Sequence, residues 1–518
     1  MKIGYIKIPR INIASNTRLW REKRMLTYSF ENIGPEPLYL HLYKCIKNDI
    51  LDGVLLSGTK LPSKRSFAKN LGISSITVEN AYAQLQAEGF IYSIPKKGFY
   101  VTMLPDSMPG IKEEYINHET GRITAGNLIE EESQYRIDLV SNMTPTTNFP
   151  FSIWAKLMRE VISEKSSELM KKSPWGGIME LRSAISLHLK QFRNMDVAPE
   201  QIITGAGTEY LYTLIIQLLG YDKVYAVENP GYKKVAQIYK SNNVACEYIP
   251  VGKAGIVIEE LEKHNADVAH ISPSHHYPTG IITPVSRRYE ILAWASKKKD
   301  RYIIEDDYDS EFRLEGKPMP ALQEIDIMER VIYINTFTKS LAPTIRISYM
   351  VLPWKLLHEF YNKLSFYSCT VSNFEQYTLA RFINDGYFEK HINRMRNYYR
   401  KVRDKLMDEI KGSRLADICE ISEEGSGLHF LLKIHTEIPD SEYVGICRQN
   451  KINVSCLSQY YIDDKDTVKA GIADSTARDG YKDREHTIIM NYSGVKMEDV
   501  KETVSLLCKS LGLAKTGG

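Results

Sequence analysis

From residue 136 to about residue 512, short apolar runs alternate with longer segments of helical periodicity. The apolar runs include residues 202–204, 224–227, 268–271, 302–304 and 331–334. Alternating strands and helices predict an α/β fold with a mostly parallel sheet, and such sheets bind ligands at the carboxyl ends of their strands. Beyond residue 355 the pattern becomes helix-rich and then mixed, which predicts a smaller C-terminal lobe beside a large lobe.

Residues 36–103 are predicted to form a separate N-terminal domain. Apolar residues at helical spacing predict its first helix, and serine N-caps predict the next two. Two short strands then flank a basic turn around Pro95. This order of elements predicts a winged helix-turn-helix. The spacing and cap residues are Tyr39, Leu42, Ile46 and Ile50, with Ser63 and Ser74.

The third helix of this domain is rich in small polar residues where it would enter a major groove, and basic residues bracket it where phosphates would lie. Composition alone leaves open a simpler alternative, in which the same elements form a small core with solvated lysines. The predicted DNA-binding residues are Lys64, Arg65, Ser74, Ser75, Thr77, Asn80, Lys96 and Lys97.

The distribution of charge supports a DNA-facing end. Residues 1–35 carry seven Lys and Arg against two acids, residues 36–103 carry eight against five, and the whole chain has a net charge of +3. The rest of the chain therefore sums to −5. Such asymmetry is typical of a nucleic-acid-binding end on an acidic body. Residues 1–35 are interpreted as a basic leader and residues 104–135 as a linker. Residues 1–25 are read as an arm that contacts DNA, as a flexible leader, or as a segment that precedes a true start at Met25.

Composition excludes several other classes of protein. Hydrophobic residues make up 43% of the chain and charged residues 25%, a balance typical of folded globular domains. No apolar run reaches the ~18 residues that a membrane span needs. The seven cysteines include no CxxC pair, which predicts a reducing, cytoplasmic location. His275 and His276 are adjacent, so their side chains would point apart, and no metal site is expected.

Three strand ends carry residues that could do chemistry. Gly205–Thr208 opens a helix and offers backbone N–H groups to a phosphate. Four acids lie between residues 305 and 309, an arrangement that needs cationic partners. Lys339 follows the next strand and Arg346 lies seven residues on, which could place a Schiff-base lysine beside a phosphate clamp. Taken singly, each could also be a turn, a solvated acid cluster or a surface lysine.

Longer motifs resemble a known family. SHHYPTG (274–280), IIEDDYDSEF (303–312) and NTFTKSLAPTIRISYMVLP (335–353) resemble fold-type I aminotransferases, and LPSKRSFAKNLGISSITVENAYAQLQAEGF (61–90) resembles a GntR-type winged helix. The two in this order resemble the MocR/GabR-type transcription regulators over residues 30–512. The resemblance implies an aminotransferase-like effector domain at residues 136–512 with pyridoxal 5′-phosphate as cofactor.

The same resemblance implies roles for individual residues. Lys339 would carry the cofactor as a Schiff base, Asp306 would pair with the ring nitrogen, Tyr308 would bond the ring hydroxyl, and Tyr232 would stack on the ring. The residues implied to hold the phosphate are Arg346, Thr336, Thr338, Ala206, Gly207 and Thr208.

The chain also departs from its relatives. Tyr277 stands where aminotransferases have an asparagine, which favours a regulator. Lys234 and Gln459 stand where GABA-responsive regulators use two arginines to bind the effector's carboxylate, and neither offers a bidentate fork. The expected effector is therefore another amino acid, an amine, or pyridoxal phosphate itself. In the recognition helix, Ser75 and Glu79 replace basic residues, so fewer guanine contacts are expected.

These observations favour a cytoplasmic, pyridoxal-phosphate-dependent transcription regulator that binds a double-stranded operator. By resemblance it would act as a homodimer, with the head of one subunit over the body of the other. The alternatives are an aminotransferase with an accessory DNA-binding head, for which slow half-transamination would suffice, and a DNA-binding protein whose body is inactive. Sustained turnover with amino donors and 2-oxo acids would distinguish the aminotransferase from the regulator.

Overall fold

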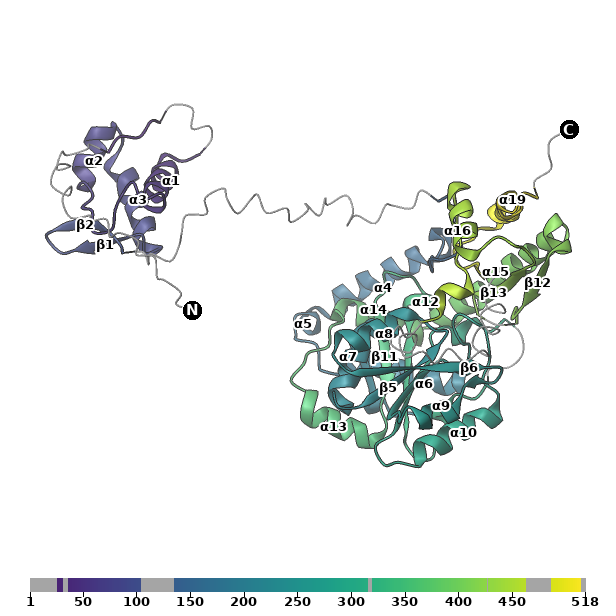
Figure 1. Ribbon diagram of the computed structural model, residues 1–518. Helices are drawn as coiled ribbons and strands as arrows, with labels where there is room; N and C mark the ends of the chain where they lie inside the picture. The colour runs from purple at the N-terminus through teal and green to yellow at the C-terminus, as the bar shows by residue number, and fades with distance from the viewer. Residues whose placement is uncertain are drawn as a thin grey trace, which may run out of the picture. The chain divides into compact units, whose positions relative to one another are not determined.

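The computed structural model describes residues 26–30, 36–103, 135–314, 319–425, 427–462 and 486–513. The chain divides into two compact units, residues 1–130 and 131–518, which are described separately (Figure 1). Most of the predicted leader (1–35) and nearly all of the predicted linker (104–135) lie outside the described residues.

The N-terminal unit is a winged helix-turn-helix, as predicted. Its elements are α1 (Leu38–Leu51), α2 (Lys64–Leu71), α3 (Ser75–Ala87), β1 (Ile91–Ile94) and β2 (Gly98–Val101). The hydroxyls of Ser63 and Ser74 accept hydrogen bonds from the amides of Ser66 and Thr77, so both predicted N-caps are confirmed. Gly72 ends α2 in the left-handed conformation, which sets the tight turn into α3.

Residues 26–30, which the sequence assigns to the leader, pack on the core of this unit. Leu26, Tyr28 and Phe30 contact the cluster that contains Leu42, Phe67 and the buried face of α3. The Tyr28 hydroxyl donates a 2.6 Å hydrogen bond to Asp49. The aromatic residues of this segment therefore add apolar contacts to a small domain core.

The larger unit is built on an eight-stranded sheet in the order β4-β11-β10-β9-β8-β5-β6-β7. The run from β10 to β6 is parallel, whereas β11 and β7 are antiparallel to their neighbours. All five predicted strand segments lie in this sheet, which confirms the mostly parallel α/β fold. The strands are β4 (Ile202–Ala206), β5 (Val224–Asn229), β6 (Ala245–Gly252), β7 (Gly255–Ile256), β8 (Val268–Ile271), β9 (Tyr302–Asp306), β10 (Val331–Thr336) and β11 (Ile347–Val351).

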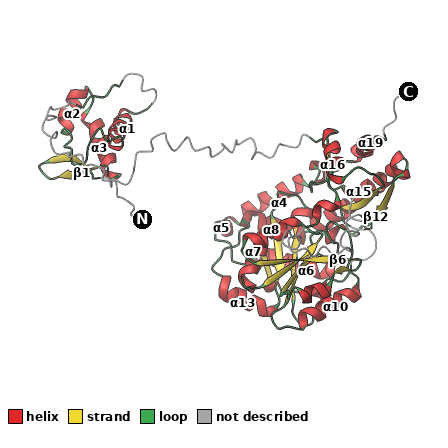
Figure 2. Cartoon of the chain, in the orientation of Figure 1, coloured by secondary structure: helices red, strands yellow, loops and turns green. Residues whose placement is uncertain are grey.

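Helices cover both faces of this sheet because successive strand residues point to opposite sides (Figure 2). Tyr302 and Ile304 of β9 pack on the first face, and Ile303 between them packs on the second. Helices on the first face are α7 (Thr208–Leu219), α8 (Lys233–Ser241) and α13 (Trp354–Leu364). On the second face lie α9 (Ile258–Lys263), α10 (Val285–Ser296) and α6 (Met179–Arg193).

The smaller lobe has a sheet of its own, in the order β12-β13-β15. The short strand β3 (Ile137–Asp138), which begins the larger unit, pairs in parallel with β14 (Ile452–Asn453). The lobe's elements are β12 (Cys419–Ser422), β13 (His429–Ile434), β15 (Thr487–Asn491), α15 (Tyr387–Lys411), α16 (Asp440–Gln449) and α19 (Val500–Ser510). This arrangement confirms the predicted second lobe.

Short elements and connecting helices complete the larger unit. The remaining α-helices are α4 (Phe151–Glu164), α5 (Ser166–Leu169), α11 (Leu322–Ile325), α12 (Phe337–Ser340) and α14 (Asn373–Asn384). The 3₁₀ turns are η3 (Thr146–Asn148), η4 (Pro199–Gln201), η5 (Ser310–Phe312), η6 (Arg414–Asp417), η7 (Leu457–Tyr460) and η8 (Met497–Asp499). Among the described residues, no helix is both long and apolar enough to cross a membrane.

Candidate functional site

A cavity of about 520 Å³ opens at the carboxyl ends of the parallel strands. Residues that follow β4, β5, β9 and β10 meet there, as the strand-end rule predicts. Of the residues predicted for the cofactor and the effector, nine line this cavity. These are Lys339, Asp306, Tyr308, Tyr232, Arg346, Thr336, Thr338, Thr208 and Lys234.

Asp306 lies at the end of β9, and protein groups contact one of its two carboxylate oxygens. Its Oδ2 accepts a 2.6 Å hydrogen bond from the Tyr212 hydroxyl, and the His270 Nε2 lies 3.5 Å away. Burial and then Asp306 itself keep the pKa of Tyr212 well above its ordinary value, so the phenol stays protonated and donates. The other oxygen, Oδ1, is buried with no hydrogen-bond partner in the described part of the chain. This oxygen can accept a hydrogen bond from a protonated ring nitrogen.

Lys339 lies in the one-turn helix α12, immediately after β10. Its Nζ lies 5.7 Å from the centre of the Tyr308 ring. Burial lowers the pKa of Lys339 to about 8, although Asp309 and Asp306 oppose the shift. A substantial fraction of this amine is therefore neutral near physiological pH, which is the form that attacks a carbonyl group.

Hydroxyls and one guanidinium lie together at the N-terminus of α7, in a corner of the cavity where we expect an anion to bind and which is called the anion-binding corner below. Thr336 and Thr338 are joined through their hydroxyls at 2.9 Å, and Thr208 and Arg346 line the same part of the cavity. Gly207 has φ +94°, and a Cβ at this position would lie 2.3 Å from Nη2 of Arg346. Glycine is therefore needed here both for the backbone conformation and for the approach of Arg346.

Two of the predicted phosphate-binding residues are not among those that line the cavity. The Ala206 amide already donates to the Thr370 hydroxyl at 2.8 Å, and the Gly207 amide donates to the Gly205 carbonyl at 3.0 Å. Gly207 instead leaves room for Arg346, because a Cβ at this position would collide with the guanidinium.

Glu209, which the sequence did not single out, lies at the centre of the anion-binding corner. Its carboxylate contacts Nη2 of Arg346 at 2.5 Å and Nζ of Lys234 at 2.6 Å. Burial would raise the pKa of Glu209, but Lys234 and Arg346 together hold it below its ordinary value. The acid that directly follows Thr208 in the sequence was the available signal for this contact.

Tyrosines form the outer wall of the cavity. The Tyr277 hydroxyl lies 2.8 Å from that of Tyr460, and the Tyr232 ring packs edge-on against Tyr277 with 6.2 Å between centres. Tyr232 is 54% exposed, so its ring presents a face to a ligand. The Tyr308 hydroxyl donates to the His275 carbonyl at 3.1 Å.

Of the two residues predicted to bind the effector, one lines the cavity and the other does not. Lys234 lines the cavity, whereas Gln459 is not among the lining residues, because its side chain turns back to accept a 3.1 Å hydrogen bond from the Cys456 amide. Its neighbour Tyr460 takes the place on the cavity wall. Residues 457–460 form the turn η7, and neighbouring side chains of such a turn point in different directions.

Glu228, at the end of β5, is a second carboxyl on the cavity wall that the sequence did not single out. It accepts a 2.9 Å hydrogen bond from the Ser272 amide. Burial raises its pKa to about 8, against that hydrogen bond, so the group is mostly protonated at neutral pH. A neutral carboxyl here adds a donor to the wall without adding a charge.

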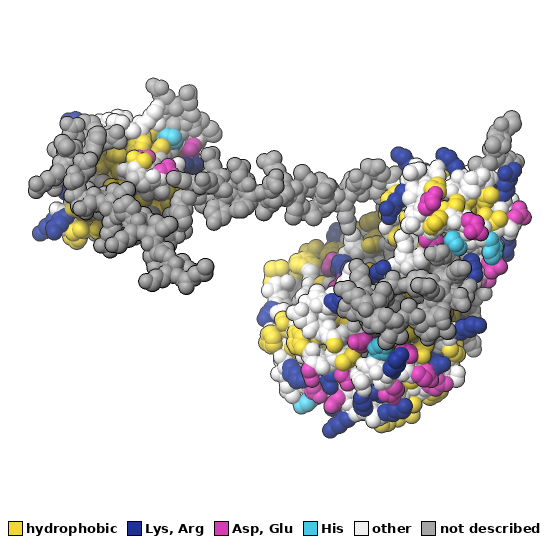
Figure 3. All heavy atoms as spheres, in the orientation of Figure 1, with side chains coloured by type: hydrophobic (Ala, Val, Ile, Leu, Met, Phe, Trp, Pro, Cys, Tyr) yellow, Lys and Arg dark blue, Asp and Glu magenta, His cyan; other side chains and the backbone are white. Residues whose placement is uncertain are grey.

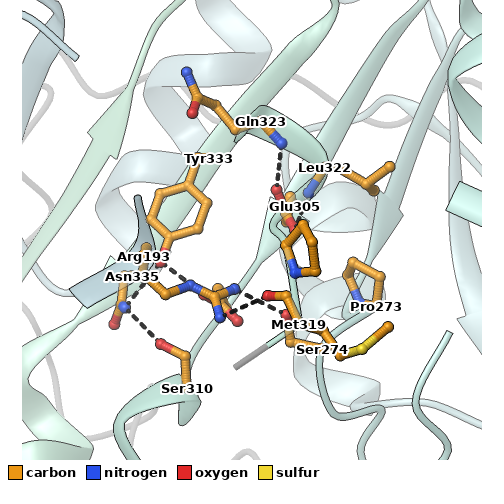
Figure 4. A network of polar contacts seen from close by, with 12 residues as sticks. Arg193, Pro273, Ser274, Glu305, Ser310, Met319, Leu322, Gln323, Tyr333 and Asn335 are labelled. Carbon is orange, nitrogen blue, oxygen red and sulfur yellow. Dashed lines mark hydrogen bonds and ion pairs between the residues drawn. The ribbon is translucent and has the colours of Figure 1, made fainter. Parts of the chain in front are cut away.

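The other acids of the 305–309 run point away from the cavity and hold the fold together. Glu305 accepts hydrogen bonds from the amides of Leu322 and Gln323 (Figure 4). Asp307 pairs with Arg193 at 2.8 Å and accepts from Tyr333 at 2.7 Å. Asp309 lies 2.7 Å from Nδ1 of His275. The predicted need for partners is met for each acid, and only Asp306 reaches the site.

Among the residues that the structure covers, no cluster of potential metal ligands is found. His275 and His276 are both buried and have different partners. His275 contacts Asp309, and Nδ1 of His276 lies 2.6 Å from the Thr279 hydroxyl.

The predicted DNA-binding residues of the winged helix differ in exposure and in their side-chain partners. Ser75 and Asn80 are exposed on α3, whereas the hydroxyls of Ser74 and Thr77 bond each other at 2.8 Å at its start. Lys64 does not stand free, because its Nζ pairs with Glu79 of α3 at 2.6 Å. Arg65, Lys96 and Lys97 are exposed. This face is therefore less basic around α3 than at the wing.

Surface charge on the larger unit is mixed. On the face drawn in Figure 3, acidic and basic side chains are interspersed over its lower part, where α9 and α10 lie. No single sign of charge dominates this drawn face.

Comparison with known proteins matches each unit to a different family. Residues 38–101 match the family "Bacterial regulatory proteins, gntR family", and residues 136–477 match "Aminotransferase class I and II". The chain is 36% identical to the uncharacterized HTH-type transcriptional regulator YdeL of Bacillus subtilis (strain 168), over 86% of this chain and 96% of that protein. It is 30% identical to the probable rhizopine catabolism regulatory protein MocR of Rhizobium meliloti, over 82% and 87%.

Solved structures share the fold of the larger unit. The multiple substrate aminotransferase from Thermococcus profundus superposes with a TM-score of 0.62 at 21% identity, and covers 77% of this chain and 97% of its own. At this level of identity the likeness establishes the fold, and substrate preference does not follow from it.

Proposed function

Because the chain belongs to the MocR type of gntR-family transcriptional regulators, which join a DNA-binding domain to an aminotransferase-like domain, we propose that its cavity binds pyridoxal 5′-phosphate. The single observation that carries this proposal is the convergence of Asp306, Lys339 and Arg346 on one cavity. When bound, the cofactor supplies an electrophilic aldehyde and a ring that acts as an electron sink.

Each end of such a cofactor has a matching group in the cavity. The unpartnered Oδ1 of Asp306 suits a protonated ring nitrogen. Tyr212 and His270 contact the other oxygen, Oδ2, and orient the carboxylate. The Lys339 amine suits the aldehyde, because its pKa is lowered to about 8 by burial. Arg346, with the hydroxyls of Thr208, Thr336 and Thr338, suits the phosphate. Tyr232 would stack on the ring.

We propose that the same cavity senses a small amine or amino acid, or pyridoxal phosphate itself. Lys234, Tyr277 and Tyr460 line the cavity wall beside Tyr232 and are placed to contact a second small molecule. Lys234 can bind a carboxylate as a point charge, and the two tyrosine hydroxyls can bind polar groups. Gln459 stays outside this proposal because its side chain bonds the Cys456 amide.

We further propose that the regulator acts in the cytoplasm as a homodimer, head to tail, on a double-stranded operator. Two winged helices per dimer would read two half-sites. Arg65, Lys96 and Lys97 would contact phosphates, with Ser75, Thr77 and Asn80 at the base edges. Lys64 would join them after release from Glu79.

Absorption spectroscopy with two variants tests the cofactor proposal. Wild-type protein titrated with pyridoxal phosphate should show the shifted absorption band of the lysine-bound cofactor, and Lys339→Ala should abolish it. Lys363→Ala is the matched control, since Lys363 lies on α13 and pairs with Glu359. The same preparations should bind the DNA upstream of their own gene. An unchanged band in Lys339→Ala would refute the assignment, and sustained turnover with amino donors and 2-oxo acids would favour an enzyme.

A further inference from the structure

The Glu209 carboxylate lies where the phosphate-binding groups of the cavity converge. It is bound on one side by Arg346 and on the other by Lys234, at 2.5 and 2.6 Å. Glu209 is the second residue of α7, directly after Thr208. The corner that would receive a phosphate therefore already holds an anion supplied by the chain itself.

A phosphate that approaches Arg346 would meet this carboxylate. With Glu209 ionised, the two cations and one anion of the corner sum to +1, and a phosphate dianion brings the corner to −1. Without the Glu209 charge, the same corner would go from +2 to neutral. Because like charges a few ångströms apart repel even in a partly solvated site, an ionised Glu209 competes with the phosphate for Arg346.

The close packing around Gly207 reinforces this competition. A Cβ on Gly207 would lie 2.3 Å from Nη2 of Arg346 and 2.7 Å from Oε2 of Glu209. The guanidinium and the carboxylate are therefore both pressed against the loop that begins α7. A phosphate that approaches Nη2 of Arg346 would therefore meet the Glu209 carboxylate at close range.

We propose that Glu209 is an internal competitor of the cofactor's phosphate: its carboxylate binds Arg346 in the cofactor-free protein and sets how tightly phosphate-bearing ligands bind. The proposal rests on the function proposed above and adds to it an affinity-setting residue. A regulator that senses pyridoxal phosphate needs an affinity matched to the concentration of that ligand. A built-in anion lowers the affinity without removing any group that the bound cofactor needs.

The chain contains a matched control carboxylate. Glu262 also bridges one arginine and one lysine, Arg301 at 2.7 Å and Lys297 at 3.1 Å. Its side chain is 35% exposed, against 31% for Glu209, and it is not among the residues that line the cavity. Glu262→Gln therefore removes a similar bridging carboxylate at a position that does not line the cavity.

The test uses full-length cofactor-free protein and two probes, inorganic phosphate and pyridoxal phosphate. Titration calorimetry should show that Glu209→Gln binds both probes about tenfold or more tightly than wild type, while Glu262→Gln binds as wild type does. Added sodium chloride should shrink the difference, because it screens the competing charge. Glu209→Asp keeps a negative charge beside Arg346, so its affinities should stay closer to those of wild type than to those of Glu209→Gln.

Equal or weaker phosphate binding by Glu209→Gln would overturn the proposal, as would tight binding by Glu209→Asp. A protein that shows no lysine-dependent cofactor band in wild type or in Glu209→Gln would instead overturn the proposed function. A wild type with a normal band and an unaltered Glu209→Gln affinity would overturn only the role of Glu209.

Discussion

The hydroxyl of Tyr212 donates a 2.6 Å hydrogen bond to Oδ2 of Asp306, and the opposite oxygen of that carboxylate has no partner among the described residues. A helix on one face of the sheet thus orients a carboxylate at the end of a central strand. Asp306 lines the cavity, so its second oxygen remains available to a ligand's hydrogen-bond donor.

Removal of this hydroxyl should weaken both the site and the fold. Tyr212→Phe leaves Asp306 with His270 alone, so we expect cofactor affinity to fall several-fold and the free energy of unfolding to fall by about 1–3 kcal/mol. Urea denaturation and cofactor titration measure the two effects. Tyr225→Phe is the control, because its hydroxyl donates to the Gly220 carbonyl at 3.1 Å and Tyr225 is not among the residues that line the cavity. Equal loss of cofactor affinity in both variants would contradict a special role for Tyr212.

The low pKa of Lys339 predicts how the rate of cofactor capture depends on pH. Only the neutral amine attacks the aldehyde, and its fraction rises as pH increases through the folded pKa of about 8. The rate should therefore rise between about pH 7 and about pH 8.5 and then level off, whereas an ordinary lysine would keep accelerating toward its usual pKa of about 10.4. Stopped-flow absorbance measures this rate. A rate that still climbs at about pH 10 would show that the site does not lower the pKa.

Gly207→Ala should abolish tight cofactor binding. The new Cβ would lie 2.3 Å from Arg346, and the residue would keep a backbone with φ +94°, so we also expect a stability loss of about 1–3 kcal/mol. Gly445→Ala is the matched control, since no atom lies within 4 Å of its added Cβ and it lies inside helix α16. That control should bind the cofactor normally and gain about 0.5–1 kcal/mol of stability. Normal binding by Gly207→Ala would contradict the proposed anion-binding corner.

The exposed wing lysine predicts a sequence-independent share of DNA affinity. Lys97→Ala should weaken binding to every DNA sequence alike and reduce the slope of log affinity against log salt by about 1. Asn80→Ala should instead reduce discrimination between operator and other DNA while leaving the slope unchanged. Fluorescence anisotropy over a range of salt concentrations separates the two. Lys509→Ala, in α19, should change neither quantity.

The sheet and the positions of its strand ends could be predicted because apolar runs and their spacing report burial directly. The runs at 268–271 and 302–304 belong to central strands, which are buried on both faces and so are mostly apolar. Caps such as Ser63 were equally readable, because their chemistry is local.

The supporting residues of the site could not be predicted in the same way. Tyr212 and His270 lie within apolar segments, where their spacing marks them as core residues. Their partner Asp306 lies 94 and 36 positions away in sequence, so only the folded sheet brings the groups together. Gln459 shows the opposite case, in which a one-residue difference in a tight turn decided which side chain faces the cavity.

The pairing of β3 with β14 has a mechanical consequence. Residues 137–138 anchor the start of the larger unit to the smaller lobe, and residues 140–142, which follow directly, line the cavity. The Asp138 carboxylate ties the two together by accepting hydrogen bonds from the amides of Val140 and Ser141. The first strand of the larger unit is thus held in place two residues before the stretch that lines the cavity. A ligand that displaced residues 140–142 would therefore strain the β3–β14 pairing within the same unit.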